Sequence, residues 1–231
     1  MEPKKSKPDR SNSVPQLRAV LDRLSREGTV VARTDGSSHR VFPVAVTPEE
    51  GAALRRWVAR ERAETTIEIG LGYGVAALHA CAGLIDAGTP EPRHLVLDPY
   101  QHARFSDVGL QLLDEAGVAD LVEFHPRASE FALPSFLEEG RSFDVAVVDG
   151  NHRFDGVFVD LWYLGRLLRP TGIVFLDDYQ LPGVARAASF FVANVGWQIE
   201  EISPADDLHQ WVVLRTPATP DERSFEHFVD F

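Results

Sequence analysis

The sequence has 231 residues, of which 44% are hydrophobic and 25% charged, a balance typical of one large or one and a half small globular domains. No stretch approaches the roughly eighteen consecutive apolar residues of a membrane span, and no hydrophobic run follows the basic N-terminus. We therefore expect a cytoplasmic protein that does not bind membranes. The formal net charge of -12 disfavours nucleic acid as a partner, and a single cysteine excludes thiolate zinc sites.

The two ends of the chain differ in composition from its middle. Residues 1–12 are rich in Lys, Pro and Ser, which predicts a flexible tail, and residues 217–231 are predicted to form an acidic C-terminal tail. Within residues 13–46, apolar positions recur at helical spacing and are followed by Gly28. This segment predicts an N-terminal helical cap or lid, with contact between the subunits of a homodimer as an equal alternative.

The main domain is predicted to span residues 47–216. Thr47 and Pro48 mark the start of a helix that runs to about Glu61, whose arginines we interpret as a solvated face. Short apolar runs then alternate with helix-length segments, as in a parallel sheet covered on both faces. The expected strands are 65–69, 94–98, 121–125, 143–149 and 172–177, and the expected helices are 75–87, 107–116, 130–138, 155–168 and 183–195.

The last two expected strands break this alternation. Segments 197–202 and 210–216 are separated by only seven residues, too few for a crossover helix, so they should pair antiparallel. The predicted fold class is therefore α/β: a Rossmann-like, doubly wound, seven-stranded and mostly parallel sheet that ends in a β-hairpin. A dinucleotide-binding dehydrogenase would instead continue to a sixth parallel strand.

A glycine-rich loop follows the first expected strand of this domain. Gly70, Gly72 and Gly74 stand where a strand turns into a helix, a place where glycines let a ligand approach the backbone. Their spacing differs from the dinucleotide fingerprint, and tight packing of helix on strand is the alternative explanation. Asp98 ends the next strand, where its carboxylate could accept hydrogen bonds from ribose hydroxyls or could cap a turn.

The glycine loop, Asp98, the five strand-helix units and the hairpin together resemble a class I S-adenosylmethionine-dependent methyltransferase over roughly residues 47–216. The resemblance implies that the three glycines pass beneath the methionine part of S-adenosylmethionine, that Glu68 helps to order their loop, and that Asp98 holds the ribose. It also places Ser129 near the adenine, although Ser129 could equally be the N-cap of the helix that starts at Glu130.

Three carboxylates and a histidine follow two further strands. Asp149, Asp177 and Asp178 stand at strand ends that should meet in the ligand crevice. Carboxylates brought this close must take up protons or bind a cation, and oxygen ligands select a hard divalent ion, Mg²⁺ first. His152 lies three residues after Asp149, and its ordinary pKa suits a general base, although a structural histidine is the alternative.

The spacing of residues 149, 152, 177 and 178 resembles the divalent-metal-dependent O-methyltransferases, and the histidine is similar to enzymes of the macrocin, or antibiotic-sugar, type. By this resemblance Asp149, Asp177 and Asp178 hold the metal, Asp149 also lies at the cofactor, and His152 is the catalytic base. The Asp177-Asp178 pair departs from the Glu-Asp common in the sugar enzymes, and Asn151 replaces an aspartate of many relatives.

We therefore expect an S-adenosylmethionine-dependent enzyme that methylates a hydroxyl of a small molecule, such as a sugar or another natural-product acceptor. Two alternatives stay open at this point. One is an NAD-dependent oxidoreductase, and the other is a methyltransferase-like binding protein or cyclase that transfers no methyl group.

Overall fold

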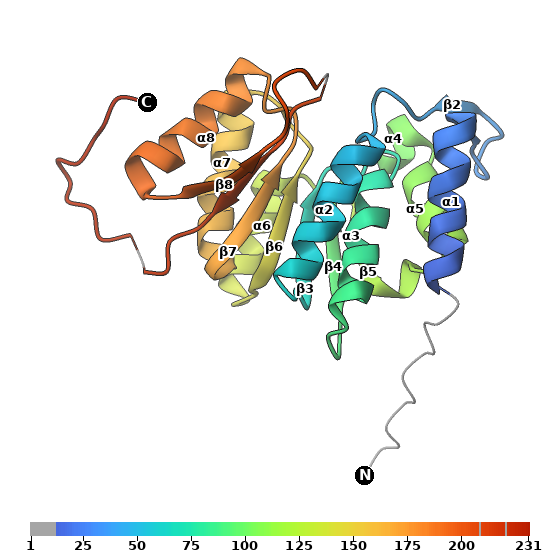
Figure 1. Cartoon of the computed structure of the whole chain (residues 1–231), viewed down its shortest axis with the longest axis horizontal. Coiled ribbons are helices and arrows are strands. Elements are labelled where there is room, and N and C mark those ends of the chain that lie inside the picture. The colour runs from blue at the N-terminus through green and yellow to red at the C-terminus, as the bar shows by residue number, and fades with distance from the viewer. Residues whose placement is uncertain (1–12, 208, 220) are drawn as a thin grey trace, which may run out of the picture.

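The computed structural model describes residues 13–207, 209–219 and 221–231, and among them seven strands form one sheet in the order β5-β4-β3-β6-β7-β9-β8 (Figure 1). These strands are β3 (Thr65–Ile69), β4 (Arg93–Leu97), β5 (Val122–His125), β6 (Phe143–Val148), β7 (Leu168–Leu176), β8 (Gln198–Ile202) and β9 (Val212–Arg215). Strands β3 to β7 pair parallel, whereas β9 pairs antiparallel with both β7 and β8. The predicted mostly parallel sheet with a terminal hairpin is confirmed.

Helices cover both faces of this sheet and define two hydrophobic clusters. Helices α1, α2, α3 and α5 bury one face, and α6, α7 and α8 bury the other. The helices are α1 (Ser13–Glu27), α2 (Pro48–Arg60), α3 (Val75–Ala87), α4 (Gln101–Phe105), α5 (Val108–Glu115), α6 (Ser129–Glu138), α7 (Phe154–Leu167) and α8 (Pro182–Val195), with a 3-10 turn over Ala119–Leu121. No helix in the described part of the chain is long and apolar enough to cross a bilayer.

All of the expected strands and helices but one lie within one or two residues of the observed ones. Strand β7 begins at Leu168, four residues before the expected start. The side chain of Arg169 donates to Asp144 at the start of β6. The pairing of β7 with β6 shifts register between Phe143 and Val145, so the strand includes an irregularity that its sequence pattern does not show. The short helix α4 was not expected, since its five residues carry no capping side chain and too few positions for a periodic pattern.

The segment 13–46 is only partly helical, which corrects the expectation of a helical cap. After α1 the chain forms a separate two-stranded antiparallel sheet from β1 (Thr29–Val31) and β2 (Ser38–Arg40). The apolar face of α1 is buried against the hydrophobic core of this same chain, and Arg33 pairs with Asp114 and Glu115 of α5. That apolar face is therefore already covered, while the roles of lid and of dimer contact stay predictions.

The two expected tails differ in what the structure describes. Residues 1–12, predicted to be flexible, lie outside the described residues. The C-terminal tail folds back along α8 (Figure 1), where the Asn194 side chain exchanges two hydrogen bonds with the backbone of Val229 at 2.9 and 2.7 Å. Phe231 then packs edge-on against Phe190.

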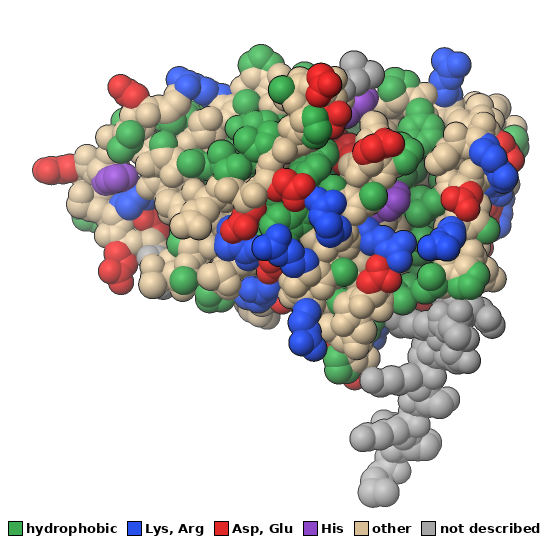
Figure 2. Space-filling view, in the orientation of Figure 1, with side chains coloured by type: hydrophobic (Ala, Val, Ile, Leu, Met, Phe, Trp, Pro, Cys, Tyr) green, Lys and Arg blue, Asp and Glu red, His purple; other side chains and the backbone are tan. Residues whose placement is uncertain are grey.

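The arginines of α2 lie on a face where the two signs of charge alternate. Figure 2 shows basic side chains interspersed with acidic ones on this side of the molecule. Arg55 pairs with Asp86 of α3, and Arg56 pairs with Glu201 of β8. This arrangement fits the interpretation of α2 as a solvated helix face.

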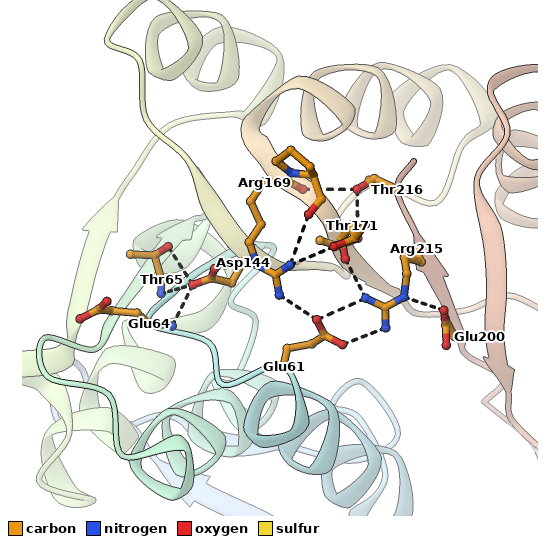
Figure 3. Close-up of polar contacts among 11 residues, drawn as sticks. Glu61, Glu64, Thr65, Asp144, Arg169, Thr171, Glu200, Arg215 and Thr216 are labelled. Atoms are coloured by element: carbon orange, nitrogen blue, oxygen red, sulfur yellow. Dashed lines mark hydrogen bonds and ion pairs between the residues drawn. The ribbon is translucent and has the colours of Figure 1, made fainter. Parts of the chain in front are cut away.

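A network of ion pairs ties α2 to the sheet at the amino-terminal ends of the parallel strands (Figure 3). Glu61 follows α2, and its two oxygens accept from Arg169 and Arg215, each at 2.8 Å. Burial of the Glu61 carboxyl opposes its ionisation, but the two guanidinium groups outweigh this and lower its pKa. Asp144, at the start of β6, accepts from the backbone N–H groups of Glu64 and Thr65. Both carboxylates thus have hydrogen-bond donors, two guanidinium groups for Glu61 and two backbone N–H groups for Asp144.

Replacement of Glu61 by glutamine should lower the free energy of unfolding at pH 7 by about 2 kcal/mol, because two largely covered guanidinium groups lose their counter-charge. The pKa of Glu61 is lowered in the folded state, so this stabilisation is complete above the ordinary glutamate pKa and is lost as the pH falls through the folded value. Urea unfolding at several pH values measures it. Glu200→Gln, which removes a single contact to Arg215, should cost less than about 1 kcal/mol.

Candidate active site

The glycine loop between β3 and α3 lies directly against the residues that follow β6. Asp149 donates its backbone N–H to the carbonyl of Ile69, and Gly70 donates to Leu97 of β4. Gly70 has a φ of 94°, and a Cβ there would lie 2.1 Å from the carbonyl oxygen of Asp149. Only glycine fits this contact. At Gly72, in contrast, no described neighbour lies within 4 Å of the position that a Cβ would occupy, so its outer side is open.

Asp98 connects this loop to β4 through hydrogen bonds of its carboxylate. The residue is 4% exposed, and its Oδ2 accepts from the backbone N–H groups of Leu71 and Gly72 at 3.2 and 3.1 Å and from Gln101 at 2.9 Å. Its Oδ1 accepts from the backbone N–H of Tyr100. A carboxylate offers about four acceptor sites, so Oδ1 keeps room for a ligand hydroxyl, and the ribose contact stays a prediction.

Glu68 and Ser129 have surroundings that were not expected. Glu68 is fully buried on β3, and its Oε2 lies 3.0 Å from Nε2 of His94 rather than at the glycine loop. Thr66 completes this buried chain at 2.8 Å from Nδ1 of His94. Ser129 is the first residue of α6, whose N-cap is Ala128, so the N-cap alternative is wrong. Its place near an adenine stays a prediction.

The carboxyl ends of β6 and β7 bring Asp149, His152 and Asp177 together. Each offers one ligand atom, and these atoms lie within 4.8 Å of one another, the arrangement that a metal ion requires. Asp177 is 5% exposed, and its Oδ1 is buried without a hydrogen-bond partner among the described residues. Burial of Asp149, followed by the charge of Asp177, raises the pKa of the Asp149 carboxyl well above its ordinary value. These are the features of a site that attracts a cation.

Asp178 takes a different position from the one expected of a third metal ligand. Its Oδ2 lies 2.9 Å from Nδ1 of His152, and its Oδ1 accepts from Gln180 at 2.6 Å. The other ring nitrogen of His152, Nε2, is 3.6 Å from Asp149 and has no hydrogen bond within the described chain. Asp178 therefore orients the imidazole, while Nε2 points at the carboxylates.

The two carboxylates around His152 favour its charged form. Asp149 first and Asp178 second raise the pKa of the imidazole to about 10. A histidine that is protonated at neutral pH cannot accept a proton from a substrate. Neutralisation of Asp149 by a bound cation would lower this pKa, so a role of His152 as base depends on the cation site being filled.

Glu50 is a buried acid near this group that the sequence did not reveal. It lies in the first turn of α2, is 1% exposed, and both of its carboxylate oxygens lack a hydrogen-bond partner within the described part of the chain. Burial first, and then the charges of Asp177 and Asp149, raise the pKa of Glu50 to about 10. The available signal was its spacing, because positions 50, 53, 54 and 57 form the buried stripe of α2.

The comparisons with known proteins identify the family. Residues 67–179, which hold the glycine loop, Asp98 and the carboxylate cluster, match the family model described as a methyltransferase domain. This part of the chain is a methyltransferase domain. This match confirms the family predicted from the sequence and disfavours the NAD-dependent alternative.

Solved methyltransferase structures share the whole fold. The O-methyltransferase TomG from Streptomyces achromogenes, involved in tomaymycin synthesis and solved with S-adenosylmethionine, has a TM-score of 0.66 at 19% identity over 92% of this chain and 100% of its own. An O-methyltransferase from Bacillus cereus, solved with S-adenosylhomocysteine, has a TM-score of 0.65 at 16% identity over 87% of this chain and 90% of its own. At these identities the likeness establishes the fold.

A sequence relative comes from rice. Tricin synthase 2 of Oryza sativa subsp. japonica is 29% identical over 145 residues, which are 62% of this chain and 47% of the rice protein. The match thus spans about half the length of that relative.

The contact between the glycine loop and β6 yields a paired prediction. Gly70→Ala should lower the free energy of unfolding by at least about 3 kcal/mol, because it adds a clash with the Asp149 carbonyl to the strain of a positive φ. Gly72→Ala, with a φ of 50° and open space, should cost about 1 kcal/mol. Urea unfolding of both variants checks this, and equal losses would contradict the close contact at Gly70.

Proposed function

We propose that this methyltransferase transfers the methyl group of S-adenosylmethionine to a hydroxyl oxygen of a small molecule with the help of a divalent cation. The observation that carries the proposal is the group formed by Asp149, His152 and Asp177, with a buried, unpartnered oxygen on Asp177 among the described residues. The O-methyltransferase relatives from Streptomyces and Bacillus and the relative from rice support the same class of reaction.

The cofactor is proposed to lie over the glycine loop. Gly70, Gly72 and Gly74 would pass beneath its methionine part, where the open side of Gly72 leaves space for it. Asp98 would accept the ribose hydroxyls at Oδ1, Ser129 would lie near the adenine, and Asp149 would lie beside the methionine part.

The residues at the strand ends fit a hard divalent cation, which we propose to be Mg²⁺. Asp149 and Asp177 supply carboxylate oxygens, which such ions prefer, and the pair is unfavourable in its charged form without a positive partner. Asp178, expected from the sequence as a third ligand, faces His152 and Gln180 instead, and we propose it as the carboxylate that orients the histidine. When bound, the cation would hold the acceptor hydroxyl and lower its pKa.

His152 is proposed to be the general base. Its Nδ1 faces Asp178 at 2.9 Å, which fixes the ring, and its Nε2 has no hydrogen bond to the described residues. The proton of the acceptor hydroxyl would therefore move to Nε2. The oxygen would attack the sulfonium methyl in line, the S–CH3 bond would break with its electron pair on sulfur, and S-adenosylhomocysteine would leave. Alignment of the two substrates supplies much of the rate gain in such reactions.

The acceptor class is proposed to be a sugar or another natural product. The Streptomyces relative is involved in the synthesis of tomaymycin, and the rice relative is named as a synthase of tricin. A cytoplasmic location is proposed because the single cysteine fits a reducing compartment. We propose no nucleic acid or membrane partner, and a homodimer stays open.

Removal of the cation should abolish methyl transfer. A chelator in excess is expected to lower the turnover number at least ~100-fold, and added Mg²⁺ should restore it. Asp149→Asn should give the same loss without rescue by Mg²⁺ at the concentration that restores the wild type. Transfer of a labelled methyl group to a panel of sugars and phenols measures the rate. Undiminished transfer in the chelator would contradict cation assistance.

Loss of the imidazole should separate binding from catalysis. His152→Ala is expected to bind S-adenosylmethionine with wild-type affinity in calorimetry, while the turnover number falls ~100-fold or more. Asp178→Asn should retain the fold and show a smaller loss, because the ring keeps its base but loses its orienting carboxylate. A His152→Ala variant with full turnover would exclude His152 as the base.

A further inference from the structure

The carboxylate cluster at the strand ends includes a residue from outside the matched methyltransferase domain. Glu50 belongs to α2, which precedes residues 67–179, and it is buried near enough to Asp177 and Asp149 for their charges to raise its pKa, just outside the group of three ligand atoms that lie within 4.8 Å of one another. It is the neighbour of Glu49, an exposed residue in the same helical turn. One glutamate of this turn thus faces water, and the other faces the sheet.

The backbone of α2 fixes where Glu50 points. The hydroxyl of Thr47 accepts from the backbone N–H of Glu50 at 3.2 Å and caps the helix. Gly51 comes next, and a Cβ on it would lie 2.2 Å from the ring of His79 on α3. Because α2 is packed this closely on α3, the helix cannot turn Glu50 away from the strand ends without losing that contact.

The buried carboxylate of Glu50 has no cationic partner among the described residues, and its nearest polar neighbours are the backbone of Thr47 and the acid Asp177. Both of its oxygens, and Oδ1 of Asp177, are buried without a hydrogen-bond partner among the described residues. Two ionised carboxylates cannot hydrogen bond to each other, since neither carries a donor, and a buried carboxylate with no partner costs free energy. Basic side chains of α2 do not compensate, because Arg55 and Arg56 pair with Asp86 and Glu201 elsewhere. A positive ligand is the group that this arrangement lacks.

We propose that Glu50 contributes a carboxylate to the coordination of the divalent cation, beside Asp149 and Asp177. This inference rests on the cation of the proposed function. It gives α2 a role in the site, since the helix supplies a charged oxygen that the strand ends do not. The ligand class is a hard divalent ion such as Mg²⁺ or Mn²⁺, which oxygen donors select.

Binding of Mn²⁺ alone to the full chain tests the inference without an assay of activity. The affinity of the wild type for Mn²⁺, followed by the electron paramagnetic resonance signal of the free ion, is compared with that of Glu50→Gln. The variant should bind Mn²⁺ at least ~10-fold more weakly, as expected for loss of a group that holds a metal. Glu49→Gln removes the same charge from the same helical turn and should bind as the wild type does.

Melting temperatures separate a local effect from misfolding. Without Mn²⁺, Glu50→Gln should melt at or above the wild-type temperature, because it relieves repulsion between buried acids. Saturating Mn²⁺ should then raise the melting temperature of the wild type more than that of the variant. Glu50→Asp retains the charge on a shorter side chain and should give an intermediate affinity, which keeps the test available if the glutamine variant does not fold.

Two results would overturn the inference, and they differ in meaning. If Glu50→Gln and the wild type bind Mn²⁺ with equal affinity, Glu50 is excluded from the cation site and the proposed function stays intact. The same holds if Glu50→Gln weakens the binding of S-adenosylmethionine but leaves the binding of Mn²⁺ unchanged. A wild type that binds no Mn²⁺ would instead contradict the cation of the proposed function, and the role of Glu50 with it.

Discussion

The repulsion between acidic groups gathered at the carboxyl ends of β6 and β7 is the constraint on which the rest of the site depends. Asp149 and Asp177 lie within ligand distance of one another, and Glu50 is buried beside them. In a region with little water, like charges at this separation do not persist unless protons or a cation neutralise them. The fold holds the groups together because close backbone contacts, such as that between Gly70 and Asp149, leave the strand ends no room to separate.

The acidic side chains at the two ends of the sheet differ in whether they have hydrogen-bond or ion-pair partners. At the amino-terminal ends Glu61 and Asp144 each have guanidinium or backbone donors, so charge there holds the α2 helix against the strands. At the carboxyl ends Asp177 and Glu50 retain oxygens without a partner among the described residues. Glu61, directly after the last turn of α2, thus has ion-pair partners, whereas Glu50, in the first turn of the same helix, has none among the described residues. Acids with donors therefore lie at one end of the sheet, and acids with unpartnered oxygens among the described residues lie at the other.

The fold was accessible from the sequence because its signals are local. The apolar run 143–148 and the glycines after β3 predict a strand and a turn without knowledge of any distant residue. The pairing of side chains was less accessible. His94 and Glu68 meet across two neighbouring strands, and Asp178 turns toward His152 instead of joining Asp149. Glu50 resembles an ordinary acid at a helix start, since its burial depends on how α2 packs against the sheet.

The order of the last strands has a consequence for how the chain assembles. Strand β9 is the last in the sequence, yet it lies between β7 and β8. The backbone groups along the outer edge of β7, which are bonded to residues Val212–Arg215 in the finished molecule, have no strand beside them until that segment has left the ribosome. A nascent chain that pauses earlier would present an apolar, unpaired strand edge, the kind of surface on which intermolecular β-pairing and aggregation begin.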